Sequence, residues 1–259
     1  MTKYPATAAV AQTYETPGSK SPLDAISAYE EYQREWASSE LGSHVISKRM
    51  ELPRGRIRSW QNGSKPDVVR GLDTAQEHGW LEAPVDGELF AALNRLVAGV
   101  FSGGSISKET FEPSFSATDS TVEDLIRSDL ETLGVGCRLV HSSSGDTEEL
   151  RPDEDKYVLG RVLVALGAPA GPKAETVDRL PAYLDNAPEN VRRDFVRVYF
   201  ANRGVDVDGR DFTQIMEERP EQYLDSLAAL IDSVVTEEVW HSGQIVRMRK
   251  SGLDELGLA

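Results

Sequence analysis

The chain has 259 residues, of which 39% are hydrophobic, and it carries a formal net charge of −15. That length suits one large domain or two ordinary ones, with enough apolar residues for a true core. No run approaches the roughly 20 apolar residues of a membrane-spanning helix, and the first residues lack the apolar segment of a secretory signal, so we expect a cytoplasmic protein. The single cysteine, Cys137, excludes an internal disulfide, and with only four histidines it argues against a structural zinc site.

The net charge has two interpretations. The chain contains 8 lysines, 20 arginines and 43 acidic residues. Scarce lysine with abundant acid is typical of salt-adapted cytosolic proteins, in which salt screens the self-repulsion of an acidic surface. On that interpretation the charge does not exclude a nucleic-acid partner, although nucleic-acid binders are usually basic. The alternative is an ordinary acidic protein that never meets DNA.

The N-terminal region is expected to divide into a leader and a helix. Residues 1–22 are rich in Ala, Thr, Ser and Pro and lack apolar periodicity, which predicts a disordered leader. After it, Ile26, Tyr29 and Tyr32 recur near one face of the segment 23–36. This spacing predicts the first helix.

Residues 44–78 contain turn and helix-end residues at the spacing of a helix-turn-helix. A short helix is expected at 44–50 and a turn at 51–53, where Pro53 suits the first turn of the next helix. The second helix places Ile57 and Trp60 toward the core and ends at Asn62-Gly63. A third helix is expected at 66–78, with an apolar stripe formed by Val68, Val69, Leu72 and Ala75. With the first helix these elements predict a small all-α domain over residues 23–82.

Local charge favours DNA binding by this region. Between His44 and Pro66, six basic residues stand against one acid, an excess of five positive charges. Arginines on the second helix suit the major groove, because guanidinium groups bind phosphates and take a guanine edge bidentately. We expect the second-helix arginines to approach the groove and the other basic residues to bind phosphates, and the predicted contacts are Lys48, Arg49, Arg54, Arg56, Arg58 and Lys65. The alternative is a solvated basic hairpin without a ligand.

From Val85 onward, long helices alternate with short strand-like stretches. A helix predicted at 88–100 ends at Gly103-Gly104, where glycine tolerates the left-handed backbone of a helix end. A strand at 110–117, a helix opened by the capping box Ser120–Glu123, a strand at 137–141 and a helix at 155–166 follow. Residues 186–248 repeat this order about 100 residues later. We therefore expect two similar units, 83–184 and 185–259.

Two segments at equivalent places resemble the LAGLIDADG motif of homing endonucleases. They are residues 97–105 (VAGVFSGGS) and residues 196–204 (VRVYFANRG). Residues 157–173 are similar to the "L…LG-x-P-x-G-x-K" segment between the motifs of intein-type members, and Leu180-Pro181 with the helix leading to Phe195 resembles the approach to the second motif. The resemblance covers residues 85–246. It implies an α+β fold in which tandem pseudo-two-fold αββαββα repeats form a β saddle. The small helical domain precedes these repeats in the chain.

The acidic residues of the motif are missing. In active members, carboxylates from both halves hold the divalent metals that activate water. Their positions here fall on Ser102, Gly104, Ala201 and Arg203, none of which is acidic. We therefore expect neither a metal site nor another cofactor, with Mg²⁺ required only if the chain is an endonuclease after all. Nearby Asp206 and Asp208 are better explained by a strand entering an Asp-Gly hairpin turn.

The resemblance extends to sporulation-regulator-type proteins, in which a degenerate LAGLIDADG domain is fused to a DNA-binding element. The leading hypothesis is therefore a non-catalytic, sequence-specific protein that binds double-stranded DNA and regulates transcription. One alternative is a divergent metal-dependent DNA endonuclease or RNA maturase. A second alternative is a protein-interaction module, which the acidic bulk favours and the basic cluster opposes. Because both halves lie in one chain, we expect a monomer with an internal pseudo-two-fold axis and no membrane partner.

Overall fold

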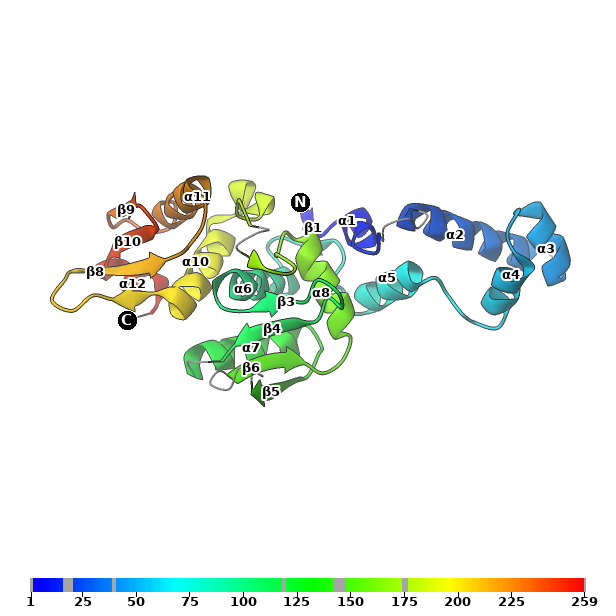
Figure 1. Ribbon diagram of the computed structural model, residues 1–259, viewed down its shortest axis with the longest axis horizontal. Coiled ribbons are helices and arrows are strands. Elements are labelled where there is room, and N and C mark those ends of the chain that lie inside the picture. Colours follow the sequence, from blue (N-terminus) through cyan, green and yellow to red (C-terminus); the bar gives the residue numbers. More distant parts are fainter. Residues whose placement is uncertain are drawn as a thin grey trace.

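The computed structural model describes residues 2–15, 21–38, 41–117, 120–141, 148–173 and 177–258. Figure 1 shows an elongated molecule in which a body of helices and sheets carries a projecting helical arm formed by α2, α3 and α4. Two separate hydrophobic clusters correspond to these parts, a large one in the body and a small one in the arm. No helix among the described residues is long and apolar enough to cross a membrane.

The N-terminal residues belong to the body, which corrects the expectation of a disordered leader. β1 (Lys3–Tyr4) pairs antiparallel with β2 (Ala83–Pro84), and α1 (Thr7–Gln12) buries Val10 and Ala11 completely. Such a contact is too short to produce an apolar period in the sequence. Residues 16–20 of the expected leader lie outside the described residues.

The arm consists of α2 (Pro22–Ser38), α3 (Ser43–Arg49) and α4 (Arg54–Gln61). The helix predicted at 23–36 and the two shorter helices after it are confirmed. Their small core is aromatic, with the ring of Trp60 edge-on to Tyr29 at 5.3 Å, and its buried members are Tyr29, Tyr32, Ile46, Ile57 and Trp60. Glu51, in the turn between α3 and α4, adopts a positive φ of 52°. We call α3, this turn and α4 the α3–α4 hairpin.

The helix α5 (Asp67–Glu77) returns the chain to the body. Its Val69 packs against the arm cluster, whereas Ala75 belongs to the body core together with Trp80 and Leu81. The indole of Trp80 donates a hydrogen bond to the Leu133 carbonyl at 3.0 Å. The helix α5 therefore contacts both cores and connects the arm to the body.

The body contains two αββαββα repeats in tandem, as expected from the resemblance. The first comprises α6 (Glu88–Ser102), β3 (Ser105–Ile106), β4 (Pro113–Ser116), α7 (Ser120–Thr132), β5 (Cys137–His141), β6 (Glu148–Pro152) and α8 (Lys156–Ala165). After the 3₁₀ helix η1 (Ala182–Asn186), the second comprises α10 (Glu189–Arg203), β7 (Val205–Asp206), β8 (Phe212–Met216), α11 (Glu221–Asp232), β9 (Val239–Ser242), β10 (Ile245–Arg249) and α12 (Ser251–Leu256). The sheets have equivalent antiparallel orders, β3-β4-β6-β5 and β7-β8-β10-β9.

One predicted strand is shorter than expected. The segment 110–117 forms β4 only over Pro113–Ser116, and β3 precedes it. Phe111 has a positive φ of 61°, and its carbonyl oxygen would lie 1.7 Å from a Cβ placed on Gly160. A bend that a buried glycine accommodates therefore interrupts the strand, and this contact joins positions about 50 residues apart.

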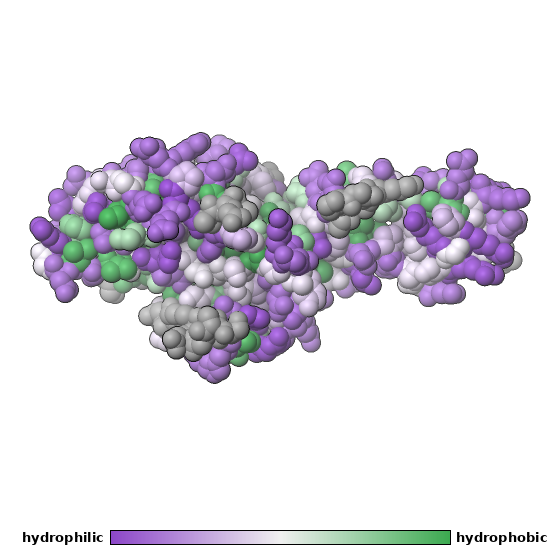
Figure 2. Space-filling view, viewed as in Figure 1, coloured by the Kyte–Doolittle hydropathy of each residue, from purple (hydrophilic) through white to green (hydrophobic). Residues whose placement is uncertain are grey.

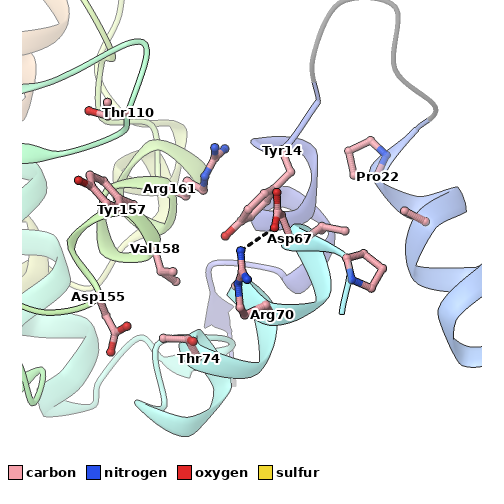
Figure 3. A pocket seen from close by; sticks show the side chains of 14 residues that line it. Tyr14, Pro22, Asp67, Arg70, Thr74, Thr110, Asp155, Tyr157, Val158 and Arg161 are labelled. Atoms are coloured by element: carbon pink, nitrogen blue, oxygen red, sulfur yellow. Dashed lines mark hydrogen bonds and ion pairs between the residues drawn. The ribbon is translucent and has the colours of Figure 1, made fainter. Parts of the chain in front are cut away.

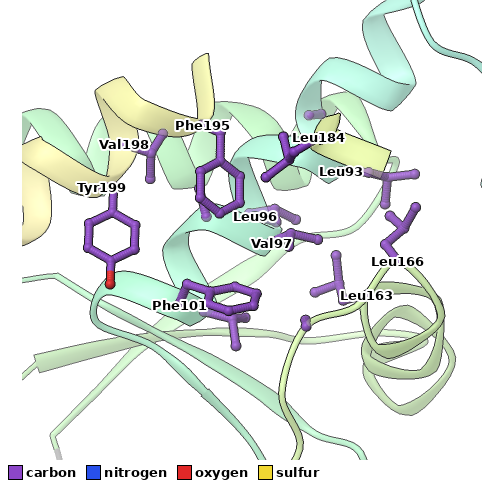
Figure 4. Packing of buried hydrophobic residues seen from close by; sticks show 14 of the residues in the cluster. Leu93, Leu96, Val97, Phe101, Leu163, Leu166, Leu184, Phe195, Val198 and Tyr199 are labelled. Atoms are coloured by element: carbon purple, nitrogen blue, oxygen red, sulfur yellow. The ribbon is translucent and has the colours of Figure 1, made fainter. Parts of the chain in front are cut away.

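The two motif helices, α6 and α10, pack against each other along their apolar faces (Figure 4). Leu93, Leu96, Val97 and Phe101 of α6 meet Phe195, Val198 and Tyr199 of α10, and all seven are at most 3% exposed. Asn94, fully buried, donates to the Val191 carbonyl at 2.9 Å and accepts a hydrogen bond from the Tyr183 hydroxyl at 2.8 Å. This pairing is the central contact of the pseudo-two-fold fold.

Candidate nucleic-acid interface

Helix α4 presents one face to solvent at the end of the arm. Ile57 and Trp60 bury the opposite face in the arm core. Because residues three or four apart share a helix face, Gly55, Arg58 and Ser59 lie together on the outer side. A Cβ added at Gly55 would have no heavy atom within 4 Å, so the helix surface there is open to close approach.

The three arginines of α4 are not equivalent, although all are exposed. Arg54 is anchored, since its Nε donates to the buried Ser43 hydroxyl at 3.2 Å. Arg56 lines a cavity of about 340 Å³ between α2 and α4, shared with Lys65 and Asp24. Of the three, Arg58 lies nearest the centre of the outer face, between Gly55 and Arg54, whereas Arg54 and Arg56 lie toward its opposite edges.

The other predicted basic contacts differ in their partners. Arg49 forms an ion pair with Glu35 at 2.8 Å and Lys65 with Asp73 at 2.5 Å, and the hydrogen bond to Asp73 raises the pKa of Lys65. Within the described ranges, the side chains of Lys48, Arg56 and Arg58 form no hydrogen bond or ion pair. Thus three of the six cationic side chains have no acidic or polar side-chain partner in the part of the chain that the structure describes.

The motif positions meet at the ends of α6 and α10, where both helices stop. Asn202 donates to the Ser102 hydroxyl at 2.8 Å, and that hydroxyl donates to the Ala98 carbonyl at 2.8 Å. Ala201 is half-buried beside the body core. A neutral hydrogen-bonded contact therefore joins the halves at this point.

Gly104, the second acidic position of the first motif, has no room for a side chain. A Cβ there would lie 2.3 Å from the Ser114 carbonyl oxygen and 3.2 Å from the Gly99 carbonyl oxygen. Its own amide donates to that Gly99 carbonyl at 2.7 Å. Any L-side chain, a carboxylate included, requires the backbone of β4 to move.

Arg203, the equivalent position of the second motif, binds a buried acid instead of a metal. Its Nε donates to Glu217 at 3.1 Å, and Glu217 is only 3% exposed. The Tyr199 hydroxyl donates to the same carboxylate oxygen at 2.9 Å. Within the described ranges, no three His, Cys, Asp or Glu side chains are arranged to hold a metal ion. The motif residues therefore do not fit the metals of a LAGLIDADG nuclease.

Lys173 was identified in the sequence only as part of the segment between the motifs. Its ammonium donates to the carbonyls of Val100 and Phe101, at 2.9 and 3.3 Å, and so satisfies the end of α6. Its pKa is lowered to about 8, mainly by burial and also by Arg219 and Arg203, while Glu217 acts in the opposite direction. The lysine therefore lies at the base of the motif interface.

The open face of the second sheet was missed in the sequence. Strand alternation buries Thr213 and Ile215 against the helices, while residues of the opposite parity are partly exposed. Cross-strand registers place them together, and the set comprises Phe212, Gln214, Met216, Trp240, Ile245, Arg247 and Arg249. In Figure 2, apolar residues also gather at this end of a mostly hydrophilic surface. The alternation of apolar and polar residues over 246–249 was a signal available for finding this face, whereas residues 212–216 show no such alternation.

Arm and body meet at a cavity of about 670 Å³ between α1, α2, α5 and α8 (Figure 3). The Arg161 guanidinium lies between two rings, 4.0 Å from the centre of Tyr14 and 3.9 Å from that of Phe111, and it donates to the Thr13 carbonyl. A Cβ on Gly71 would meet the Tyr14 hydroxyl at 1.7 Å. These contacts hold α1 and α5 against α8. Because α5 connects the arm to the body, they also hold the base of the arm in place.

The acids after the second motif behave as expected from the sequence. β7 and β8 form an antiparallel hairpin, and Gly209 has a positive φ of 67° in its turn. Asp206 is exposed and forms an ion pair with Lys250 at 2.9 Å. Asp206 therefore belongs to the hairpin surface.

Comparison with known proteins gives one curated relative and several similar structures, and no family model matches. The tRNA-splicing ligase RtcB of Pyrococcus abyssi (strain GE5 / Orsay) is 26% identical over 181 residues, covering 65% of this chain and 19% of that protein. The chain thus spans about a fifth of that relative's length.

The similar solved structures are LAGLIDADG-type proteins. Full-length DUF199/WhiA from Thermatoga maritima has a TM-score of 0.46 at 9% identity, covering 71% of this chain and 60% of that one. The homing endonuclease I-WcaI bound to its DNA recognition sequence gives 0.45 at 8% (75% and 87% covered), and I-DmoI in complex with DNA and Mn gives 0.41 at 8% (66% and 94%). The LAGLIDADG-like arrangement rests on the repeat topology and helix pairing of this chain, and these likenesses say nothing of its activity.

Proposed function

We propose that this chain is a sequence-specific DNA-binding protein without nuclease activity that regulates transcription. The observation that carries the proposal is the α3–α4 hairpin, which stands on an arm with its own core and turns a cationic helix face toward solvent. The hairpin is positively charged, whereas the whole chain carries a net charge of −15. An anionic partner is therefore expected to bind at the hairpin and not elsewhere on the surface.

The positions of the basic residues suggest that they contact different parts of the DNA. Arg58 lies where a docked helix approaches base edges, and arginine is the side chain that takes guanine O6 and N7 bidentately. Arg54 and Arg56, on the flanks, are placed for phosphates of the two strands bordering the groove. Lys48, unpaired on the preceding helix, is placed for a further phosphate.

The open face of the second sheet offers a second contact. Gln214, Arg247 and Arg249 supply hydrogen-bond donors across neighbouring strands. The Arg247 guanidinium lies 5.7 Å from the Phe212 ring centre and that of Arg249 5.7 Å from the Trp240 ring centre, so both are held over apolar surface. An arm and a sheet face on one chain would bind a longer DNA site than either alone.

The endonuclease alternative has less support. It requires carboxylates at the motif positions, yet Gly104 has no space for one and Arg203 is held by Glu217. A positive guanidinium at a metal position repels the cation. The missing acids therefore favour binding over cutting.

The test is selection of bound sequences from a random duplex pool at high potassium, with magnesium in half the samples. Arg58→Gln is the key variant, and Arg34→Gln is its matched control, an exposed arginine on α2 of the same arm. We expect a consensus for the parent and the control. In Arg58→Gln the discrimination at one base pair should fall by about 1–3 kcal/mol. Arg56→Gln should weaken all sequences alike.

Three results would contradict this proposal. Cutting that requires magnesium would establish the nuclease. A consensus that Arg58→Gln leaves unchanged would remove α4 as the reading element. The absence of any enrichment would favour the protein-interaction module.

A further inference from the structure

A cluster of charged side chains lies at the base of the motif interface. It consists of Lys173, Arg203, Arg219 and Glu217, with the Tyr199 hydroxyl donating to the carboxylate. Arg203 and Arg219 both approach the Glu217 carboxylate, at 3.1 and 3.8 Å. Lys173 binds the last turn of α6, which meets the end of α10 where Asn202 donates to the Ser102 hydroxyl. The cluster draws on both halves, since Lys173 binds the end of α6 while Arg203 ends α10.

The charges of this cluster do not balance. Arg203 and Arg219 pair with the same carboxylate, Glu217, and Lys173 has carbonyl partners but no ion pair among the described residues. That is an excess of two positive charges when the lysine is protonated. An unbalanced charge in a partly buried site is costly unless a counter-ion compensates it.

The Arg219 side chain shows this imbalance most directly. Its side chain is only 8% exposed, and its Nε is buried without a hydrogen-bond partner in the described part of the chain. Its nearest carboxylate oxygen, on Glu217, is 3.8 Å away, beyond hydrogen-bond distance. Glu217 is already engaged by Arg203 and Tyr199. A buried guanidinium with an unused donor indicates a missing acceptor.

The donors of this cluster suit a tetrahedral oxyanion. Arginine forks match the geometry of phosphate oxygens, and a lysine adds a compact point charge. Arg203, with 45% of its side chain exposed, leaves a way in from solvent, and its terminal nitrogens make no hydrogen bond within the described ranges. Lys173 has used two of its three N–H groups on α6 carbonyls.

We propose that Lys173, Arg203 and Arg219 form a phosphate-binding site at the junction of the two repeats that requires no metal ion. The phosphate is either a backbone phosphate of a DNA duplex or a free phosphate group. The duplex source rests on the proposed function, whereas the binding of free phosphate does not.

The first arm of the test is calorimetric titration of inorganic phosphate into the full chain at constant ionic strength without divalent cations. Arg203→Gln should weaken binding by about tenfold or more, because it removes a charge-assisted contact. The matched control is Arg210→Gln, an exposed arginine in the β7–β8 turn, which should bind as the parent does. Glu217→Gln should bind more tightly, because it removes the competing carboxylate. A folding defect cannot mimic that gain.

The second arm adds a random-sequence duplex of about two helical turns. Displacement of bound phosphate by the duplex would identify the DNA backbone as the source, and phosphate retained beside bound duplex would identify a free phosphate group. Absence of phosphate binding would overturn the site. Equal binding by the parent, Arg203→Gln and Arg210→Gln would also overturn it, because the phosphate would then bind elsewhere on the chain. These results do not depend on the result for Arg58→Gln. The experiment can therefore overturn the phosphate site without overturning DNA reading by α4, and the reverse.

Discussion

Arg95 joins three of the body helices through one guanidinium. It holds Asp129 of α7 through two nitrogens at 2.5–3.0 Å and Asp194 of α10 at 3.0 Å. Asp129 is 1% exposed, and its burial raises the pKa of the carboxyl to about 6 although Arg95 lowers it. The charged form is therefore disfavoured in the folded chain despite its partner.

A pH dependence of stability follows from Asp129. As the pH falls from 6 to 4, the folded chain takes up a proton that the unfolded chain takes up only near its ordinary pKa of 3.8. This group thus adds stability as the pH falls, by at most about 3 kcal/mol, and the gain is lost again as the pH rises through 6. In Asp129→Asn the contribution should vanish. Urea unfolding of both proteins between pH 4 and 7 measures it, and equal pH profiles would refute it.

Gly104 provides a second prediction at the scale of one residue. Gly104→Ala should lower the free energy of unfolding by roughly 1–3 kcal/mol, because its Cβ meets the Ser114 carbonyl at 2.3 Å. Gly55→Ala is the control, since Gly55 has open space in an exposed helix and alanine there should be neutral or stabilising. Thermal unfolding compares them. A Gly104→Ala protein as stable as the parent would mean that this turn can accept a side chain.

At the scale of elements, the pairing of α6 with α10 depends on one polar contact inside an apolar seam. Asn94→Ala should cost about 2–4 kcal/mol, because it leaves the buried Tyr183 hydroxyl without its acceptor and also removes the bond to the Val191 carbonyl. Asn202→Ala, which removes only the half-buried bond to Ser102, should cost about 1 kcal/mol. Denaturant unfolding of both variants measures the two losses in free energy of unfolding. Equal losses would show that the burial of Asn94 does not matter.

Helices were easier to predict than strands for a physical reason. An amphipathic helix repeats its apolar residues within its own segment, so the stripes at 88–100 and 220–235 were visible in the sequence. β1 and β3 are two residues long and exist only because a distant strand pairs with them. No local pattern of two residues can predict such a pairing.

At the scale of the whole molecule, the arm and the body have separate cores of very different size. Trp60→Ala should unfold the arm alone, since losing an aromatic core residue costs about 3–5 kcal/mol and the arm core has few other members. Hydrogen exchange should quicken in residues 29–61 while α6 and α10 stay protected. Trp36→Ala is the control, because Trp36 is 47% exposed on the same arm. Loss of protection throughout the chain would mean that arm and body fold as one unit.

The sequence by itself determined the helical periodicities, the tandem order, the position of the basic cluster and the loss of the motif acids, because each is carried by neighbouring residues. It did not determine that residues 2–15 join the body or that Glu217 binds Arg203. Nor did it indicate the unbalanced cluster around Arg219. Those features arise only when distant segments meet, as Ser102 and Asn202 do across 100 residues, and burial then decides which charges find partners.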